Sequence, residues 1–290
     1  MTADKYCVMG NPVAHSQSPW IHARFAELTG QHVDYGRREI PLDGFAQGVR
    51  AWQAEGGRGC NITVPFKFEA AAVAQHMSDR GQLAQACNVL TFTEEGVQAD
   101  NTDGIGLVRD IRDHAGVNLR DKSLLLLGAG GAASGVLGPL IEAGCARIVV
   151  ANRTLSRAQA LVQRHLPLAQ AHRVALSAAA LAPLAQDQHG SAAAHTFDVV
   201  INATASSLAG AGVPVHASVM KPGALALDMM YGPGAQEFLG WARAHGAVAR
   251  DGLGMLVEQA AEAFLIWRGV RPPSAQVLAE LRLRLEGGKP

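Results

Sequence analysis

One stretch, SLLLLGAGGAASGVLGPLIEAG at residues 123–144, constrains the fold of this chain more than any other. Its four leucines predict a buried strand, the glycines after them a tight turn, and the apolar remainder a helix that ends at Gly144. The uncharged part is long enough to cross a membrane, but its middle consists of glycine, alanine and serine. The order of strand, glycine-rich turn and helix instead indicates an α/β sheet.

The same alternation of strand and helix continues to residue 251. Apolar runs predict further strands at residues 146–152, 173–177, 197–203, 224–231 and 248–250. Helical patterns such as SRAQALVQRHL and AQEFLGWARAHG lie between them. This arrangement predicts a Rossmann-type, doubly wound parallel sheet.

A separate α/β unit precedes this sheet. Strands are predicted at residues 5–10, 32–40 and 60–64 and in the hairpin NVLTFTEEGVQAD, which has a Glu-Gly turn. Helices are predicted at residues 18–30, 42–55 and 104–114. Ser18 and Pro19 suit the N-cap and the first position of the first helix.

The segment CNITVPFK, residues 60–67, places polar side chains beside a lone lysine. Side chains alternate along a strand, so Asn61 and Thr63 share one face, while Val64 belongs to the other, buried face. Pro65 ends the strand because it has no N–H to donate. Lys67 follows within about one turn and can lean over the polar face. The alternative is that all three polar side chains are simply exposed to water.

The composition favours a small molecule as partner. Lys and Arg number 25, and so do Asp and Glu, and no block of like charge predicts a nucleic-acid or membrane surface. The four cysteines are scattered without metal-like spacing, and the N-terminus has no signal-peptide pattern. We therefore expect reduced thiols, no metal and a cytoplasmic location. A monomer or a homodimer is expected, although the sequence does not decide between them.

A G-x-G-x-x-A pattern opens the helix after the leucine strand. Glycines there let the backbone approach a pyrophosphate, whose charge the helix N-terminus stabilises. The alternative is a glycine-rich turn that only allows close packing of helix on strand. The strand before it and the helix after it favour dinucleotide binding. The residues expected to contact the cofactor here are Gly128, Ala129, Gly130, Gly131 and Ala132, with Ala133 completing the pattern.

The end of the second Rossmann strand predicts which dinucleotide binds. An acidic residue there would hold the ribose hydroxyls of NAD, but Asn152, Arg153 and Thr154 stand in its place. An arginine can hold a 2′-phosphate through paired hydrogen bonds, which indicates NADP (NADPH). Arg157, at the start of the next helix, either helps to bind it or is an ordinary solvated residue. Met229 and Gly252 complete the expected cofactor contacts.

Several polar residues outside this sheet are candidates for a binding site. Each has an ordinary alternative when taken singly: an N-cap, a turn former or a solvent-facing position. They are Ser16, Ser18, Asn88, Asp103 and Gln259.

Taken together, the motifs resemble the shikimate dehydrogenase family over nearly the whole chain. They are, in order, GNPVAHSQSPWIH, NITVPFK, DNTDG, GAGGA, NRT, DMMY and DGLGMLVEQAAEAFLIW. The resemblance implies a reversible, NADPH-dependent reduction of 3-dehydroshikimate to shikimate, in aromatic amino-acid biosynthesis. It also implies a substrate-binding and catalytic domain of residues 1–103 and 252–290, and an NADP-binding domain of residues 104–251. The C-terminal helices would return to the first domain.

The resemblance assigns a role to each polar candidate. Lys67 and Asp103 match the family's catalytic pair. Ser16 and Ser18 would bind the ring carboxylate of the substrate. The remaining substrate contacts would be Asn61, Thr63, Asn88, Tyr231 and Gln259.

Some positions depart from the family pattern. Ala205 and Ser207 alter the loop near the nicotinamide, and Met230 stands where an aromatic residue is common. Two other functions therefore stay open. One is a quinate/shikimate dehydrogenase that uses NAD, against which Ser18 and Arg153 argue. The other is a non-catalytic paralogue that binds NADP or shikimate, against which the intact Lys67 and Asp103 argue.

Overall fold

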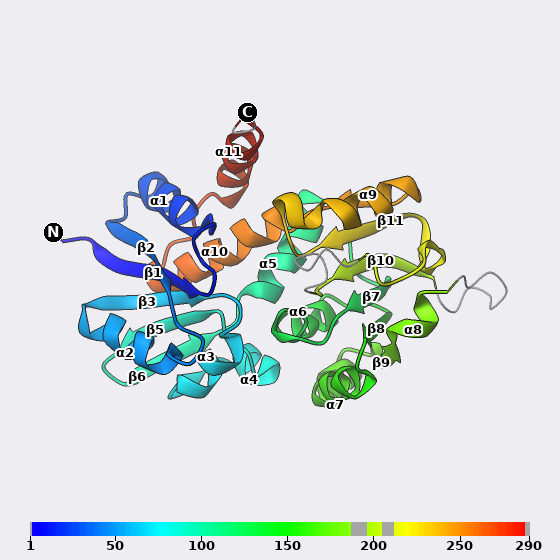
Figure 1. The fold of residues 1–290 in the computed structure, drawn as a ribbon, viewed down its shortest axis with the longest axis horizontal. Helices are drawn as coiled ribbons and strands as arrows, with labels where there is room; N and C mark the ends of the chain where they lie inside the picture. The colour runs from blue at the N-terminus through cyan, green and yellow to red at the C-terminus, as the bar shows by residue number, and fades with distance from the viewer. Residues whose placement is uncertain (1, 187–195, 205–211, 288–290) are drawn as a thin grey trace. The chain divides into compact units, whose positions relative to one another are not determined.

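The chain divides into two compact units, each described here by itself. The computed structural model describes residues 2–186, 196–204 and 212–287, and Figure 1 labels most of its helices and strands. The first unit comprises Met1–Gly106 and Leu256–Pro290, and the second comprises Leu107–Met255. The domain boundaries expected from the sequence, after residues 103 and 251, stay a prediction.

A mixed sheet forms the centre of the first unit. Its strands lie in the order β2-β1-β3-β5-β6-β4. They are β1 (Asp4–Gly10), β2 (Val33–Glu39), β3 (Gly57–Ile62), β4 (His76–Met77), β5 (Val89–Thr93) and β6 (Gly96–Asp100). β1 pairs with β2 and β3 in parallel, whereas β5 runs antiparallel to both β3 and β6. The sheet therefore brings the ends of β3 and β6 next to the start of β5.

Helices from both ends of the chain complete this unit. They are α1 (Ser18–Thr29), α2 (Phe45–Ala54), α3 (Lys67–Val73), α4 (Asp79–Ala84), the first turn of α5 (Asp103–Arg109), most of α10 (Leu253–Arg268), and α11 (Ser274–Gly287). The C-terminal α11 packs on α1, where Arg24 binds Glu280 through two hydrogen bonds of 2.7 and 2.9 Å. Arg284 lies over the ring of Trp20. The return of the C-terminal helices to the first unit is confirmed.

The second unit contains the predicted parallel sheet. Its strand order is β12-β11-β10-β7-β8-β9, and every pair is parallel. The strands are β7 (Ser123–Leu127), β8 (Arg147–Asn152), β9 (Ala175–Ala180), β10 (Phe197–Asn202), β11 (Met220–Asp228) and β12 (Val248–Arg250). The helices are α6 (Gly131–Glu142), α7 (Leu155–Ala171), α8 (Leu181–Leu184) and α9 (Gln236–Ala244), with short turns η3 (Ala217–Val219) and η4 (Gly232–Ala235). The order reverses beside β7, as in a doubly wound sheet.

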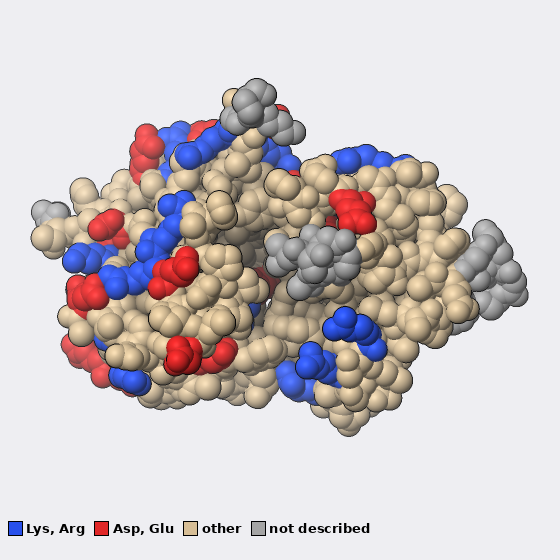
Figure 2. All heavy atoms as spheres, viewed as in Figure 1, with Lys and Arg blue, Asp and Glu red and all other residues tan. Residues whose placement is uncertain are grey.

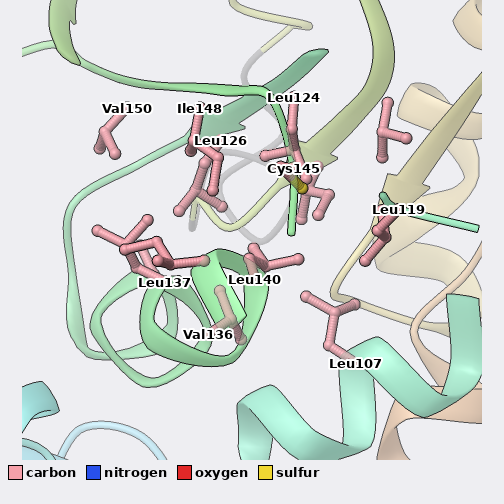
Figure 3. Packing of buried hydrophobic residues seen from close by; sticks show 14 of the residues in the cluster. Leu107, Leu119, Leu124, Leu126, Val136, Leu137, Leu140, Cys145, Ile148 and Val150 are labelled. Atoms are coloured by element: carbon pink, nitrogen blue, oxygen red, sulfur yellow. The ribbon is translucent and has the colours of Figure 1, made fainter. Parts of the chain in front are cut away.

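The leucine strand β7 explains why this sheet is covered on both faces. Leu124 and Leu126 belong to one buried cluster, in which they meet Leu137 and Leu140 of α6 (Figure 3). The alternate leucines of the same strand belong to the cluster on the opposite face. All four are fully buried, so the uninterrupted run is that of a central parallel strand.

Local details differ from the sequence predictions. Ser18 is not the N-cap of α1, because Gln17 already has helical dihedral angles and precedes the helix without a side-chain cap. Val64 is 53% exposed, since β3 ends at Ile62 and the chain turns before Pro65. The hairpin joins Thr93 to Gly96, so the two glutamates between them form its turn instead of Glu-Gly.

Two further predictions require correction. The helix predicted to continue to His114 changes at Asp110 into a π-helix, η1 (Asp110–His114). The carbonyl of Asp110 then accepts from the N–H of Ala115 at 2.9 Å. The strand predicted at residues 224–231 ends at Asp228, whose carboxylate accepts a hydrogen bond from the N–H of Met230 at 2.8 Å.

The surface carries charges of both signs. Figure 2 shows Lys and Arg interspersed with Asp and Glu over the visible face of the first unit. Within the described ranges, no helix is both long and apolar enough to cross a membrane.

Candidate active site

A charged pair occupies the centre of the candidate site in the first unit. Lys67 is the first residue of α3, and Asp103 is the first residue of α5. Lys67 Nζ donates to Asp103 Oδ2 at 2.5 Å. The side chain of Asp103 is only 5% exposed, against 16% for Lys67. A carboxylate so buried needs a partner, and the ammonium group supplies it while keeping access to solvent.

Asn88 connects this pair to the neighbouring polar groups. Its Nδ2 lies 2.9 Å from Asp103 Oδ1, 3.0 Å from Thr102 Oγ1 and 3.1 Å from Gln259 Oε1. An amide has two N–H donors, so these three acceptors share them. Asn88 Oδ1 accepts from the N–H of Thr102 at 2.8 Å. Both side chains are buried, so the alternative that Gln259 faces solvent is wrong, and the substrate-binding roles of Asn88 and Gln259 stay predictions.

A second set of polar side chains lies on the same sheet. The hydroxyl of Tyr35 on β2 donates to Asn61 Oδ1 at 2.6 Å, and Asn61 Nδ2 donates to the carbonyl of Asn88 at 3.2 Å. Desolvation of this hydroxyl raises the pKa of Tyr35 well above its usual value. The imidazole of His22 on α1 stacks on Tyr35 with the ring centroids 4.2 Å apart. Asn61 is buried, so the alternative that it faces water is wrong.

The loop before α1 holds the two candidate serines. Ser16 Oγ accepts from the N–H of Ser18 at 3.3 Å. The guanidinium group of Arg37 on β2 donates twice to the Ser16 carbonyl, at 3.1 and 2.6 Å. Ser18 is buried, with 5% of its surface exposed. Thr63, just after β3, packs against Gly10 so closely that a Cβ on Gly10 would lie 2.4 Å from the Thr63 methyl group. An arginine that holds a hydroxyl-bearing loop suits the binding of an anionic group.

Sequence reasoning missed three residues of this site: His22, Tyr35 and Thr102. Tyr35 alternates with exposed residues along β2, and His22 lies one helical turn after Ser18. Tyr35 can be connected with Asn61 only when the registers of β2 on β1 and of β1 on β3 are both known, and these are not visible in the sequence.

The turn between β7 and α6 in the second unit fits a dinucleotide phosphate. Gly128 has φ +106°, a conformation that side chains rarely adopt, and a Cβ there would lie 2.9 Å from the Ala203 carbonyl. Gly130 is the N-cap of α6, no side chain among the described residues caps the helix, and its first turn contains no acidic residue. The free N–H groups of this helix start are therefore available to an anion.

The end of β8 fits the 2′-phosphate of NADP. Asn152 Nδ2 donates to the Thr154 carbonyl at 2.9 Å and so orders the turn. The side chains of Arg153, Thr154 and Arg157 are exposed, and the first turn of α7 contains no acidic residue. Two cations without a carboxylate in that first turn suit a phosphate rather than a ribose diol.

The remaining candidates from the sequence are Gly252, Tyr231 and the loop residues Ala205 and Ser207. Gly252 lies against the backbone of Met229, where a Cβ would come within 2.2 Å of the carbonyl oxygen. Tyr231 precedes η4 in the second unit, and its role in substrate binding stays a prediction. Ala205 and Ser207 lie outside the described residues. Among the residues the structure describes, no group of three or more His, Cys, Asp or Glu side chains is arranged to hold a metal ion.

Three family models match successive parts of the chain. A shikimate dehydrogenase substrate binding domain matches residues 8–90. A shikimate/quinate 5-dehydrogenase model matches residues 110–211, and a shikimate 5′-dehydrogenase C-terminal domain matches residues 252–282.

Curated relatives match over almost their full length. The NADP⁺ shikimate dehydrogenase of Acidovorax sp. (strain JS42) is 63% identical over 286 residues, which is 99% of this chain and 98% of that protein. The enzyme of the same name from Methylibium petroleiphilum is 62% identical over 290 residues, covering 98% of this chain and 96% of the relative.

Solved structures share the fold over both units. The shikimate 5-dehydrogenase of Thermus thermophilus, in complex with NADP(H) and shikimate, is 30% identical with a TM-score of 0.81. The match covers 96% of this chain and 98% of that one. An Ael1 enzyme from Pseudomonas putida is 43% identical with a TM-score of 0.84, covering 96% and 98%.

Proposed function

This chain belongs to the shikimate dehydrogenase family, and from that premise we propose that Lys67 and Asp103 are the catalytic pair of an NADPH-dependent reduction of 3-dehydroshikimate to shikimate. The observation that carries this assignment is the hydrogen bond of 2.5 Å between the two side chains. Lys67 is the member of the pair that solvent, and hence a substrate, can reach.

The chemistry requires a proton where a carbonyl oxygen becomes negative. The cofactor, when bound, supplies the hydride. Lys67 donates a proton to the oxygen or stabilises its charge, and in the reverse direction it accepts the hydroxyl proton. Asp103 Oδ2 accepts a hydrogen bond from the ammonium group of Lys67 and holds it in place. Asn88 donates to the other carboxylate oxygen, Oδ1.

The substrate is a small acid with several hydroxyl groups, so it needs hydrogen-bonding partners and not apolar walls. Ser16 and Ser18 are proposed to bind its carboxylate, with Arg37 holding their loop in place. Thr63, Asn88, Asp103 and Gln259 are proposed to bind the ring hydroxyls. Asn61 and, by the family resemblance, Tyr231 are proposed as further substrate contacts.

We propose the cofactor-binding residues because two features of the second unit, the turn before α6 and the end of β8, fit a phosphorylated dinucleotide. The backbone around Gly128, Gly130, Gly131 and Ala132 would hold the pyrophosphate. Arg153, with Asn152, Thr154 and Arg157, would hold the 2′-phosphate. Curated relatives carry NADP⁺ in their names, which supports the same cofactor. We also propose that the enzyme is cytoplasmic and that it is a monomer or a homodimer.

Initial rates with purified protein test this function. Shikimate and quinate are each combined with NADP⁺ and NAD⁺, and nicotinamide absorbance is followed. We expect turnover mainly with shikimate and NADP⁺. Substantial rates with quinate or NAD⁺ would support the broader quinate/shikimate class. Binding of NADP⁺ without turnover in any combination would support a non-catalytic paralogue.

A further inference from the structure

Arg80 is outside the set of candidate active-site residues and binds two carboxylates, those of Asp100 and Glu262. It belongs to the short helix α4 and binds Asp100 at the end of β6 with two parallel hydrogen bonds, Nε to Oδ1 at 2.6 Å and Nη2 to Oδ2 at 2.7 Å. Its Nη1 lies 3.5 Å from Oε1 of Glu262 on α10. The Arg80 side chain is 26% exposed. This geometry fixes the guanidinium group in both distance and plane.

A chain of hydrogen bonds runs from Arg80 to the catalytic pair. Asp100 Oδ1 accepts from the N–H of Asn101 at 2.7 Å, and Asn101 Oδ1 accepts from the N–H of Asp103 at 3.0 Å. Asn101 Nδ2 also donates to the carbonyl of Ala86 at 2.7 Å. Asn101 and Asp103 are 1% and 4% exposed, so these groups cannot exchange their partners for water. The Asp100 carboxylate, to which the hydroxyl of Ser78 also donates, is therefore connected through Asn101 to the backbone of Asp103.

The backbone of Asp100 also holds Asn88. The carbonyl of Asp100 accepts from the N–H of Asn88 at 3.0 Å, beside the pairing of β5 with β6. Asn88 in turn donates to Asp103 Oδ1. Two routes from Asp100 thus reach Asp103: one through Asn101 to its backbone N–H, and one through Asn88 to the carboxylate that binds Lys67.

The same network reaches the helix that carries Gln259. Glu262 Oε2 accepts from Arg271 Nη1 at 2.8 Å, and Arg271 Nη2 lies 3.3 Å from Oε2 of Glu258. Gln259 is three residues before Glu262, so the two are neighbours on one face of α10. Through Glu262, Arg80 thus contacts the face of α10 that carries Gln259.

A purely structural role would be the ordinary expectation for a partly buried arginine. Buried ion networks contribute little net stability compared with apolar packing, however, because removing charges from water costs about as much as their attraction returns. The Arg24–Glu280 pair offers a comparison. It is also bidentate, with side chains 23% and 32% exposed, but no hydrogen bond in the described residues links it to Asp103.

We propose that Arg80, through Asp100 and Glu262, is a positioning residue that sets Asp103 and Gln259 for catalysis. This inference rests on the proposed function, because it assigns Arg80 to the Lys67–Asp103 pair. Arg80 does not touch the substrate in this scheme. Its removal should lower kcat, because the acid–base pair is misplaced, more than it raises the KM for NADP⁺.

Three variants of the full-length protein test the proposal. Arg80→Gln removes the charge and the paired donors, Arg80→Lys keeps the charge without the fork, and Arg24→Gln is the matched control. Steady-state rates with shikimate and NADP⁺ and melting temperatures are measured for each. Wild-type turnover is established first, and its absence would defeat the proposed function rather than this inference.

We expect Arg80→Gln to lower kcat by about 10²-fold, the effect of a misplacement of about 1 Å. Arg80→Lys should recover part of the rate, and Arg24→Gln should retain wild-type kcat at a comparable loss of melting temperature. If Arg80→Gln fails to fold, Glu262→Gln takes its place, because it preserves the shape and removes one charge. Equal kcat in the Arg80 or Glu262 variants and the Arg24 control would overturn the proposal.

Discussion

The phenolic hydroxyl of Tyr35 donates a hydrogen bond of 2.6 Å to the side-chain oxygen of Asn61, and this bond joins strands that are not neighbours in the sheet. β1 lies between them. The bond orients the Asn61 amide so that its nitrogen donates to the Asn88 carbonyl. One residue of the candidate substrate site is therefore held by a residue that no sequence motif contains.

Tyr35→Phe is expected to destabilise the protein and weaken substrate binding. It leaves the buried oxygen of Asn61 without its donor, which costs about 1–3 kcal/mol in the free energy of unfolding. The KM for shikimate should rise, while the KM for NADP⁺ should not. Urea unfolding and steady-state kinetics check both effects. An unchanged KM for shikimate would show that the Asn61 orientation does not matter for binding.

Arg153→Ala is expected to weaken NADP⁺ by about 1.5–3 kcal/mol, the value of a hydrogen bond to a charged group. NAD⁺, which has no 2′-phosphate, should lose much less. Arg164→Ala removes an exposed positive charge from the same helix region, α7, and serves as the control. Dissociation constants from fluorescence titration test this. Equal losses for NADP⁺ and NAD⁺ would assign Arg153 to the adenine or to the fold.

His22 should make the protein less stable in acid. Burial lowers the pKa of His22 to about 3, although its contact with the side chain of Asn61 favours the charged form. The unfolded chain has a histidine pKa of about 6.5, so between these values it binds more protons than the folded protein. The free energy of unfolding therefore falls as pH falls through this window, by at most about 1.4 kcal/mol per pH unit.

Urea unfolding of wild type and His22→Gln at pH 7.5 and 5.5 measures this contribution. The variant cannot titrate, so its free energy of unfolding should change less between the two pH values. The comparison uses the change in the free energy of unfolding between the two pH values, because loss of the stacking on Tyr35 lowers the stability of the variant at both pH values. An identical pH dependence in the two proteins would mean that folding does not lower the pKa of His22.

The cysteines should resist thiol reagents in the folded protein. All four are buried, and burial raises the pKa of Cys87 and of Cys145 to about 12. The reactive species is the thiolate, which is scarce at pH 8 for such groups. Labelling with Ellman's reagent should be slow until urea is added. Fast labelling of the native protein, with loss of activity, would show that solvent reaches a thiol beside the site.

The sequence predicts the parallel sheet well because its signals are local. Three signals follow one another within a few residues: the leucine run of β7, the turn at Gly128 and the start of α6. Each of them predicts its local conformation without reference to the rest of the chain. The site is less predictable. Lys67 and Asp103 are recognisable from motifs, but their contact depends on two helix starts that are 36 residues apart.

The errors have physical causes of the same kind. The hydroxyl of Ser18 suits a helix cap, but the helix starts one residue earlier than predicted and the serine is buried. The π-helix at Asp110 accompanies an ion pair with Arg250, 140 residues later. Tyr35 gains its partner through the pairing of strands, and Arg80 gains Asp100 and Glu262 from segments 20 and 182 residues away, so no local pattern indicates either residue.

The central claim is that Lys67 supplies the proton, and the rate of Lys67→Ala tests it most directly. Initial rates with shikimate and NADP⁺ are measured beside the affinity of the variant for NADP⁺. We expect turnover to fall by about 10²–10⁴-fold, the usual contribution of a general acid, with nearly unchanged affinity for NADP⁺. Turnover close to that of wild type would remove Lys67 from the mechanism.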